Sequence, residues 1–116
     1  MTTASQYLPA DGALDALFGA LADSTRRAIL LRLAQGPAPI GELAKPFDMS
    51  LAAVGKHVRV LEASGLVRRQ IVGRLHVCAL EPDALRTADG WLEVYRDYWT
   101  SSLDALADYV RSMDEG

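Results

Sequence analysis

Residues 50–69, SLAAVGKHVRVLEASGLVRR, decide the fold of this chain. Apolar residues recur in this stretch at steps of three, four and three, which predicts an amphipathic helix with one buried face. That face consists of Leu51, Val54, Val58 and Leu61. Ser50 is a favourable N-cap, and Gly65 stands where helices commonly end. Because the opposite face is basic and a basic strand follows, the stretch has the layout of an element that reads DNA.

The residues before this stretch predict three helices. The first runs from about Gly12 to Leu21 and carries an apolar stripe. The second has Asp23 or Ser24 as its N-cap and stops before Gly36. The third is short, from Ile40 to about Lys45, and a brief turn joins it to the helix described above. Two helices joined by a tight turn form a helix-turn-helix.

The residues after it predict a hairpin and a terminal helix. Leu66–Val72 and Leu75–Leu80 are rich in β-branched and apolar residues, and Gly73 suits the tight turn between them. From about residue 84 to 113 the pattern predicts one long helix, or two that break near Gly90. We therefore expect a mainly α fold with a small β-hairpin (α+β), a winged helix-turn-helix. Residues 12–116 form its single domain, after a flexible start at residues 1–11.

Charge is distributed unevenly along the chain. The net charge is −3, with 12 basic and 15 acidic residues, but residues 50–80 alone carry five basic groups and one acidic group. Residues 81–116 carry three basic and nine acidic groups. This segregation suits a protein that presents one basic face to phosphates, and a solvated basic loop is the alternative.

Composition limits the class of protein. With 116 residues, half of them hydrophobic, the chain can form one core without metal or disulfide support. Its single cysteine, Cys78, cannot form an intramolecular bridge, and no export segment or membrane span is evident. These features favour a cytoplasmic protein.

The terminal helix carries more apolar surface than one small domain can cover. One stripe holds Leu92, Tyr95, Trp99, Leu103, Leu106, Val110 and Met113, and the other holds Trp91, Tyr98, Ala105 and Tyr109. Since exposed aromatic and leucine side chains are costly, we expect homodimerisation through this helix and the first helix. The alternative is a helix covered by its own domain. The expected interface residues are Leu14, Leu17, Phe18, Trp91, Tyr95, Tyr98, Trp99, Leu103 and Leu106.

Several segments resemble the arsenic-repressor (ArsR) family of bacterial winged-helix regulators. LADSTRRAILLRL is similar to the family's helix with an acidic cap and two arginines, and MSLAAVGKHVRVLEASGLVRR to its recognition helix and first wing strand. GRLHVCAL resembles the second wing strand, and WLEVYRDYWTSSLDALADYV the last helix of a subgroup with aromatic residues in place of metal ligands. The resemblance covers about residues 13–110 and implies a homodimeric transcriptional regulator, usually a repressor, that binds double-stranded DNA at an inverted repeat.

Departures from the family pattern bear on metals. Metal-sensing members carry paired cysteines where this chain has GELAKPF, and others place histidines along the terminal helix. Here the histidines are His57 and His76, so we expect no metal regulation and no cofactor. The alternative is that His76 and Cys78, two residues apart on one strand face, hold a metal together with the same residues of a second copy. A buried cysteine in a strand is the simpler interpretation of Cys78.

The candidate DNA contacts lie on the basic helix and the hairpin. They are Ser50, Ala52, Ala53, Lys56, His57, Arg59, Arg68, Arg69 and Arg74. Small residues let the start of the helix lie deep in the major groove, Arg59 suits a phosphate, and Arg74 suits the flanking minor groove. For His57, packing or capping under the wing and phosphate contact are equally open. Gly55 costs about 1 kcal/mol relative to alanine, which close approach to DNA or to another backbone would justify.

Three alternative readings remain beside this one. An enzyme has little support, because the chain shows no catalytic triad and no phosphate-binding glycine loop. A winged helix that binds only protein is favoured by the acidic terminal third. A small hydrophobic ligand between Trp91, Tyr95, Tyr98 and Trp99 is also open, although aromatic stripes at helical spacing usually form core.

Overall fold

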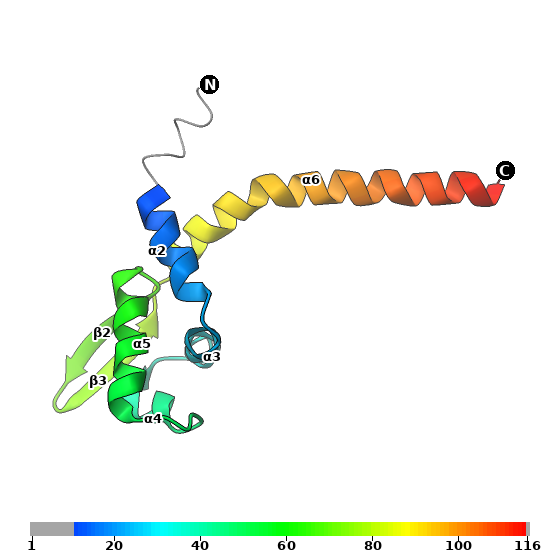
Figure 1. The fold of residues 1–116 in the computed structure, drawn as a ribbon. Coiled ribbons are helices and arrows are strands. Elements are labelled where there is room, and N and C mark those ends of the chain that lie inside the picture. Colours follow the sequence, from blue (N-terminus) through cyan, green and yellow to red (C-terminus); the bar gives the residue numbers. More distant parts are fainter. Residues whose placement is uncertain (1–10, 116) are drawn as a thin grey trace.

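The computed structural model describes residues 11–115, which form a winged-helix body and one long projecting helix (Figure 1). In chain order the elements are α2 (Asp11–Leu21), α3 (Ser24–Leu33), β1 (Ala38–Pro39), α4 (Ile40–Ala44), α5 (Leu51–Ala63), β2 (Val67–Val72), β3 (Leu75–Leu80) and α6 (Pro82–Glu115). The predicted mainly α fold with a small antiparallel sheet is confirmed. The expected flexible start lies outside the described residues, apart from Asp11, where α2 begins.

The core lies where the helices of the body meet the sheet. Three α5 residues, Val54, Val58 and Leu61, are fully buried there. They pack in one cluster with Ile29 of α3, Leu43 of α4 and Cys78 of β3, and with Leu66 just before β2. Burial of side chains this size contributes about 1.5–3 kcal/mol each relative to exposure, so α5 is held firmly by its inner face.

Side-chain caps begin the two helices that pack on each other in the body. The Asp23 carboxylate accepts a hydrogen bond from the Arg26 N–H at 3.1 Å, which starts α3. Ser50 Oγ accepts from the Ala53 N–H at 3.1 Å, which starts α5. Each cap satisfies one of the donors that a helix start leaves unpaired. The predicted caps Asp23 and Ser50 are confirmed.

The sheet has three strands in the order β1-β3-β2, one more than the sequence predicted. Strands β2 and β3 form the wing, with Val67 opposite Leu80 and Val72 opposite Leu75. Gly73, with φ +62°, supplies the left-handed conformation of the turn between them. Strand β1 adds Ala38 and Pro39 antiparallel to β3. A two-residue strand has no periodicity to detect, and its Pro39 lies at a sheet edge, where the missing N–H is tolerated.

Helix α6 is continuous over 34 residues and passes through Gly90 without a break. It leaves the body beside α2 and projects away from it (Figure 1). The radius of gyration is 19.6 Å, against about 13 Å for a compact chain of this length. Beyond the α2 contact, the apolar residues of α6 therefore meet solvent in the single chain. They include Tyr98, Trp99, Leu103, Leu106 and Tyr109.

The expected dimer interface is wrong for two leucines. Leu14 and Leu17 are buried within the chain itself, 9% and 3% exposed, because α2 packs between α5, α3 and α6. Phe18 and Trp91 are also in contact, with ring centroids 5.4 Å apart in an edge-to-face arrangement. Trp91 and Tyr95 follow at 4.8 Å. The start of α6 is thus partly covered by its own domain, as the alternative reading expected, whereas its distal part is not.

Candidate nucleic-acid interface

Helix α5 presents its outer face beside the wing. Because Val54, Val58 and Leu61 point into the core, the residues between them turn outward. Ser50, Ala52, Lys56 and Arg59 are exposed on this face, and Ala53 is half-buried. The outer face is therefore small at the N-terminal end of α5 and basic toward its middle.

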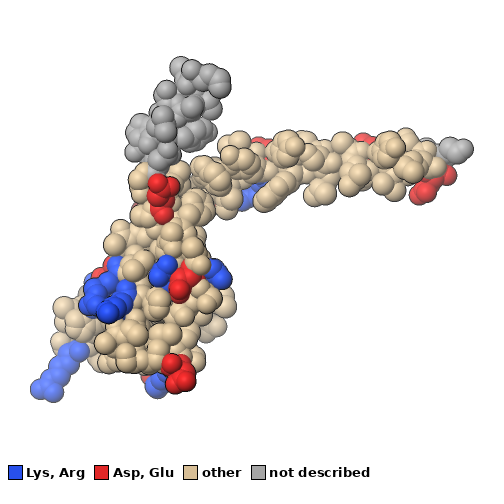
Figure 2. Space-filling model, viewed as in Figure 1, with Lys and Arg blue, Asp and Glu red and all other residues tan. Residues whose placement is uncertain are grey.

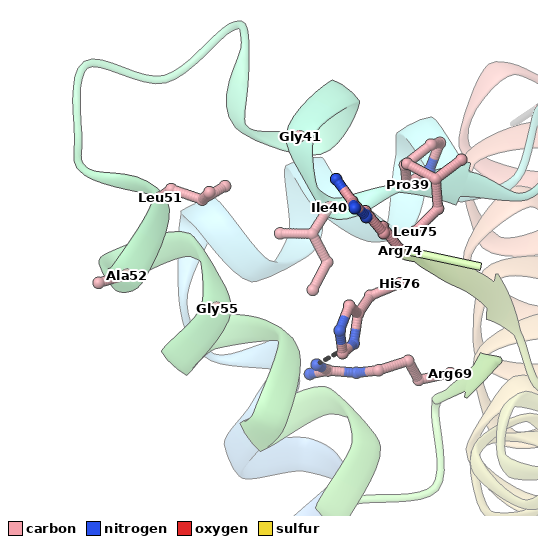
Figure 3. Close-up of a pocket in the computed structure, with 10 residues that line it drawn as sticks. All are labelled: Pro39, Ile40, Gly41, Leu51, Ala52, Gly55, Arg69, Arg74, Leu75 and His76. Carbon is pink, nitrogen blue, oxygen red and sulfur yellow. Dashed lines mark hydrogen bonds between the residues drawn. The ribbon is translucent and has the colours of Figure 1, made fainter. Parts of the chain in front are cut away.

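Leu51 does not belong to the buried face, contrary to the prediction. Its side chain is 58% exposed and lines a groove beside the wing (Figure 3). The helical spacing is correct, but Leu51 is the first residue of α5 and lies beyond the edge of the core. Periodicity gives the direction of a side chain and does not give how far the core extends.

His57 faces helix α3 and is partly buried. Its Nδ1 lies 3.8 Å from Asp23 Oδ2 and 3.4 Å from Arg26 Nη1, and its side chain is 24% exposed. The reading in which His57 packs was right about packing but wrong about the element, since the partner is α3 and not the wing. Arg26 also donates to the carbonyl oxygens of Gly19 and Ala20 at 3.0 and 2.8 Å. The sequence pattern gives no sign of this role of Arg26.

The two arginines at the start of the wing differ in how firmly other side chains of the protein hold them. Arg69 donates from Nε and Nη2 to Glu62 Oε1 at 3.1 and 2.5 Å, and its Nη1 lies 3.2 Å from His76 Nδ1. Arg69 is therefore fixed between α5 and β3, which corrects its assignment as a phosphate contact. Arg68 is exposed and lies 3.7 Å from Glu81. A surface ion pair this long is weak, so Arg68 remains available.

Three basic side chains on this face have no ion partner among residues 12–114: Lys56, Arg59 and Arg74. Lys56 and Arg59 extend from α5, and Arg74 follows Gly73 at the wing tip. Figure 2 shows basic side chains over the body that carries α5 and the wing. By contrast, Arg86, Arg96 and Arg111 on α6 each pair with an aspartate. The arginines of α3 also lack an ion partner, but they donate to backbone carbonyl oxygens. Among the described residues, the cations with neither kind of partner therefore lie on α5 and the wing.

Within the described part of the chain, no group of three or more His, Cys, Asp or Glu side chains is placed to hold a metal ion. Cys78 is buried in β3, and desolvation raises the pKa of its thiol. No helix among these residues has both the length and the apolar character to cross a membrane.

Comparison with known proteins agrees with this geometry. A helix-turn-helix domain family matches residues 21–70. The HTH-type transcriptional regulator Rv2034 of Mycobacterium tuberculosis is 39% identical over 98 residues, which are 84% of this chain and 89% of that protein. The crystal structure of the ArsR family transcriptional regulator RHA00566 superimposes with a TM-score of 0.71 at 45% identity, over 76% of this chain and 97% of that one.

A second solved structure has the same fold. An ArsR-like transcriptional regulator from Rhodococcus sp. RHA1 gives a TM-score of 0.68 at 31% identity, over 84% of this chain and 92% of that one. These relatives are transcriptional regulators. The chain belongs to the ArsR family of winged helix-turn-helix, DNA-binding transcriptional regulators.

Proposed function

We propose that the chain is a homodimeric repressor that binds an inverted-repeat operator through α5 and the wing and does not respond to metal. The observation that carries this proposal is the pair of unpartnered cations on α5, Lys56 and Arg59, whose helix is anchored by a fully buried opposite face. Arg74 adds a third such cation at the wing tip. Cations without protein partners are available to neutralise phosphates.

In this arrangement the N-terminal end of α5 enters the major groove. Ser50, Ala52 and Ala53 are small enough for close approach, and the alanines suit thymine methyl groups. Lys56 reaches base edges or phosphate, Arg59 binds phosphate further along the helix, and Arg74 enters the flanking minor groove. Arg68 provides a further phosphate contact. His57 and Arg69 have no direct role because Asp23, Arg26 and Glu62 hold them in place.

A second copy of the chain is the partner proposed for α6. Its apolar residues recur at helical spacing along 34 residues, while Asp97, Ser101, Asp104 and Asp108 share the opposite face. A continuous apolar face of this length, open in the single chain, is typical of an association surface. Two chains related by a twofold axis would present two α5 helices to half-sites about one helical turn, roughly 10 bp, apart.

The signal that releases the DNA is proposed to be something other than a metal ion. The cysteine pair of the family's metal sensors is replaced by GELAKPF, which begins in α4 and continues past its end. The lone Cys78 is buried, so it is not accessible as a ligand. A repressor that lacks these ligands needs a different effector.

Salt-dependent binding to the chain's own upstream DNA tests the proposal. For the wild-type protein, log affinity should fall steeply with log salt concentration. Lys56→Ala combined with Arg74→Ala should weaken binding and reduce the slope by up to about 4, since the dimer loses four cations and each phosphate contact contributes about 0.9. Arg86→Ala combined with Arg111→Ala removes the same charge from α6 and should leave the slope unchanged. Absence of salt-dependent binding would instead favour a module that binds only protein.

A further inference from the structure

A groove of about 480 Å³ lies between α5, the start of α4 and the wing (Figure 3). Its volume is within the range of small-molecule sites, roughly 300–1,000 Å³. It lies in the body and is separate from the aromatic residues of α6. The groove is open on one side, so that a ligand would enter it from solvent.

The walls of the groove are apolar side chains, two of which the fold leaves largely exposed. Ile40 comes from α4, Leu51 from α5 and Leu75 from β3. Leu51 and Leu75 are 58% and 53% exposed, although residues of this kind normally gain stability by burial. An apolar body placed between α5 and the wing would cover both of them.

Gly55 keeps one side of the groove open. It stands inside α5, where glycine lowers helix stability, and a Cβ at this position would meet nothing within 4 Å. Close approach to another backbone, one explanation offered by the sequence, is therefore not found among residues 11–115. The space that Gly55 leaves belongs to the groove.

The polar end of the groove favours an anion. Figure 3 shows Arg69, Arg74 and His76 reaching from the wing toward α4 and α5. Because an arginine can only donate, His76 Nδ1 accepts from Arg69 Nη1 at 3.2 Å, and the proton of the neutral ring is then on Nε2, which donates. Arg74 has no ion partner among the described residues, and no carboxylate lines the groove.

We propose that this groove binds a small amphipathic carboxylate, with its apolar body between Leu51 and Leu75 and its carboxylate at Arg74 and His76. An inorganic anion would pair with Arg74 and leave the apolar walls in water. A neutral apolar molecule would cover the walls and leave Arg74 unpaired. A carboxylate with an apolar body satisfies both ends, and arginine binds carboxylates through two parallel hydrogen bonds.

The site has a regulatory consequence that rests on the proposed function. The groove is lined by Ala52 and Arg74, both of which are proposed to contact DNA. An occupant would take the guanidinium of Arg74 and cover the N-terminal end of α5. Carboxylate and DNA would then compete for the same protein.

Octanoate, octanol and inorganic sulfate serve as probes in a calorimetric titration of the full chain without DNA. Octanoate should bind at least about tenfold more tightly than either of the others, and it should shift the backbone amide resonances of residues 40–41, 51–55 and 69–76. Equal binding of sulfate, or shifts confined to α6, would overturn the proposal.

Variants separate the two ends of the groove. Arg74→Gln should weaken octanoate binding about tenfold and leave octanol binding unchanged. Gly55→Leu should block both probes by filling the groove, with Gly55→Ala as the matched control that still binds. If Gly55→Leu does not fold, Leu51→Glu tests the same wall from an exposed position and should repel octanoate. Unchanged octanoate binding in Arg74→Gln and Leu51→Glu would overturn the site.

A final titration keeps the two proposals distinguishable. Octanoate should lower the affinity for operator DNA, whereas octylamine, which has the same apolar body and the opposite charge, should not. If octanoate binds in the groove and DNA affinity is unchanged, the site stands and competition is excluded. If no DNA binds at all, the proposed function fails and the calorimetric result for the groove is unaffected.

Discussion

The guanidinium of Arg26 lies against the imidazole of His57, with Nη1 3.4 Å from Nδ1, and this contact connects α3 to α5. The same guanidinium donates to the carbonyl oxygens of Gly19 and Ala20 at the C-terminal end of α2. One side chain therefore connects three helices of the body. Since α2 contacts α6 and α5 carries the proposed DNA contacts, Arg26 lies between the two proposed interfaces.

Replacing Arg26 should destabilise the body. In Arg26→Ala, two carbonyl groups lose their charged donor, and a hydrogen bond to a charged group contributes about 1.5–3 kcal/mol. We expect the free energy of unfolding in urea to fall by about 2 kcal/mol. Arg26→Lys keeps the charge but not the forked geometry and should restore only part of the loss. Arg86→Ala, on the surface of α6, should stay within about 0.5 kcal/mol of wild type. Equal midpoints for Arg26→Ala and wild type would exclude the connecting role.

The stability provided by Asp23 should depend on pH. The hydrogen bond from the Arg26 N–H holds the pKa of this carboxyl below its ordinary value of 3.8. Because the pKa is lower in the folded state than in the unfolded one, the carboxylate contributes fully above about 3.8 and loses its contribution as the pH falls through the folded pKa. Asp23→Asn keeps a capping side chain and removes the titration.

Melting temperatures of wild type and Asp23→Asn, measured from neutral pH to about pH 2.5, check this expectation. The wild type should be the more stable protein at neutral pH, where the carboxylate also favours the start of α3. The difference should shrink below about pH 4. A difference that stays constant across this range would contradict the assigned cause of the pKa shift.

A charge placed on the distal apolar face of α6 should dissociate the dimer. Leu103 is 64% exposed in the single chain and lies far from the contact between Phe18 and Trp91. Leu103→Glu should therefore give a monomer whose body remains folded, as sedimentation and the amide spectrum of residues 24–80 can show. Ser101→Glu places the same charge on the polar face and should remain a dimer. A dimeric Leu103→Glu variant would refute this interface, and substitution of Trp91 is a poorer test because it also disturbs the packing on α2.

Cys78 should react with thiol reagents only when the protein unfolds. It is fully buried in β3, and desolvation raises the pKa of its thiol above the ordinary 9.0, so the reactive thiolate is scarce at neutral pH. Modification in buffer should be about a thousandfold or more slower than in denaturant. Rapid reaction in buffer would mean that β3 opens locally. Cys78→Ala, which has no thiol, is the control for signal that does not come from Cys78.

The sequence predicted the parts of this fold that depend on local pattern. The caps at Asp23 and Ser50, the turn at Gly73 and the buried stripe from Val54 to Leu61 each follow from spacing or from a residue's conformational preference. Strand β1 was missed because two residues carry no period. The break considered at Gly90 is absent, since one glycine lowers the stability of a helix without ending it.

The candidate interface was less predictable because it depends on contacts distant in the sequence. In the sequence, Arg69 looks like one more basic wing residue. Only the structure shows that Glu62, seven positions earlier, lies beside it. His57 is likewise held by Asp23 and Arg26, from a different helix. Which cations remain for DNA is decided by which acids reach them, and spacing within α5 or the wing contains no information on that. The groove was unpredictable for the same reason. It is lined by residues of several elements, and the periodicity of one element does not show how it packs beside another.

The continuous α6 also gives the protein a built-in optical reporter. Both tryptophans of the chain, Trp91 and Trp99, lie on this helix, and the DNA-facing body has neither. Trp91 is partly shielded by Phe18, whereas Trp99 is 58% exposed in the single chain. As the protein is diluted, its tryptophan fluorescence will therefore report on whether another molecule buries α6. Circular dichroism reports on the helices of the whole chain. The two signals together separate dissociation from unfolding without any added label.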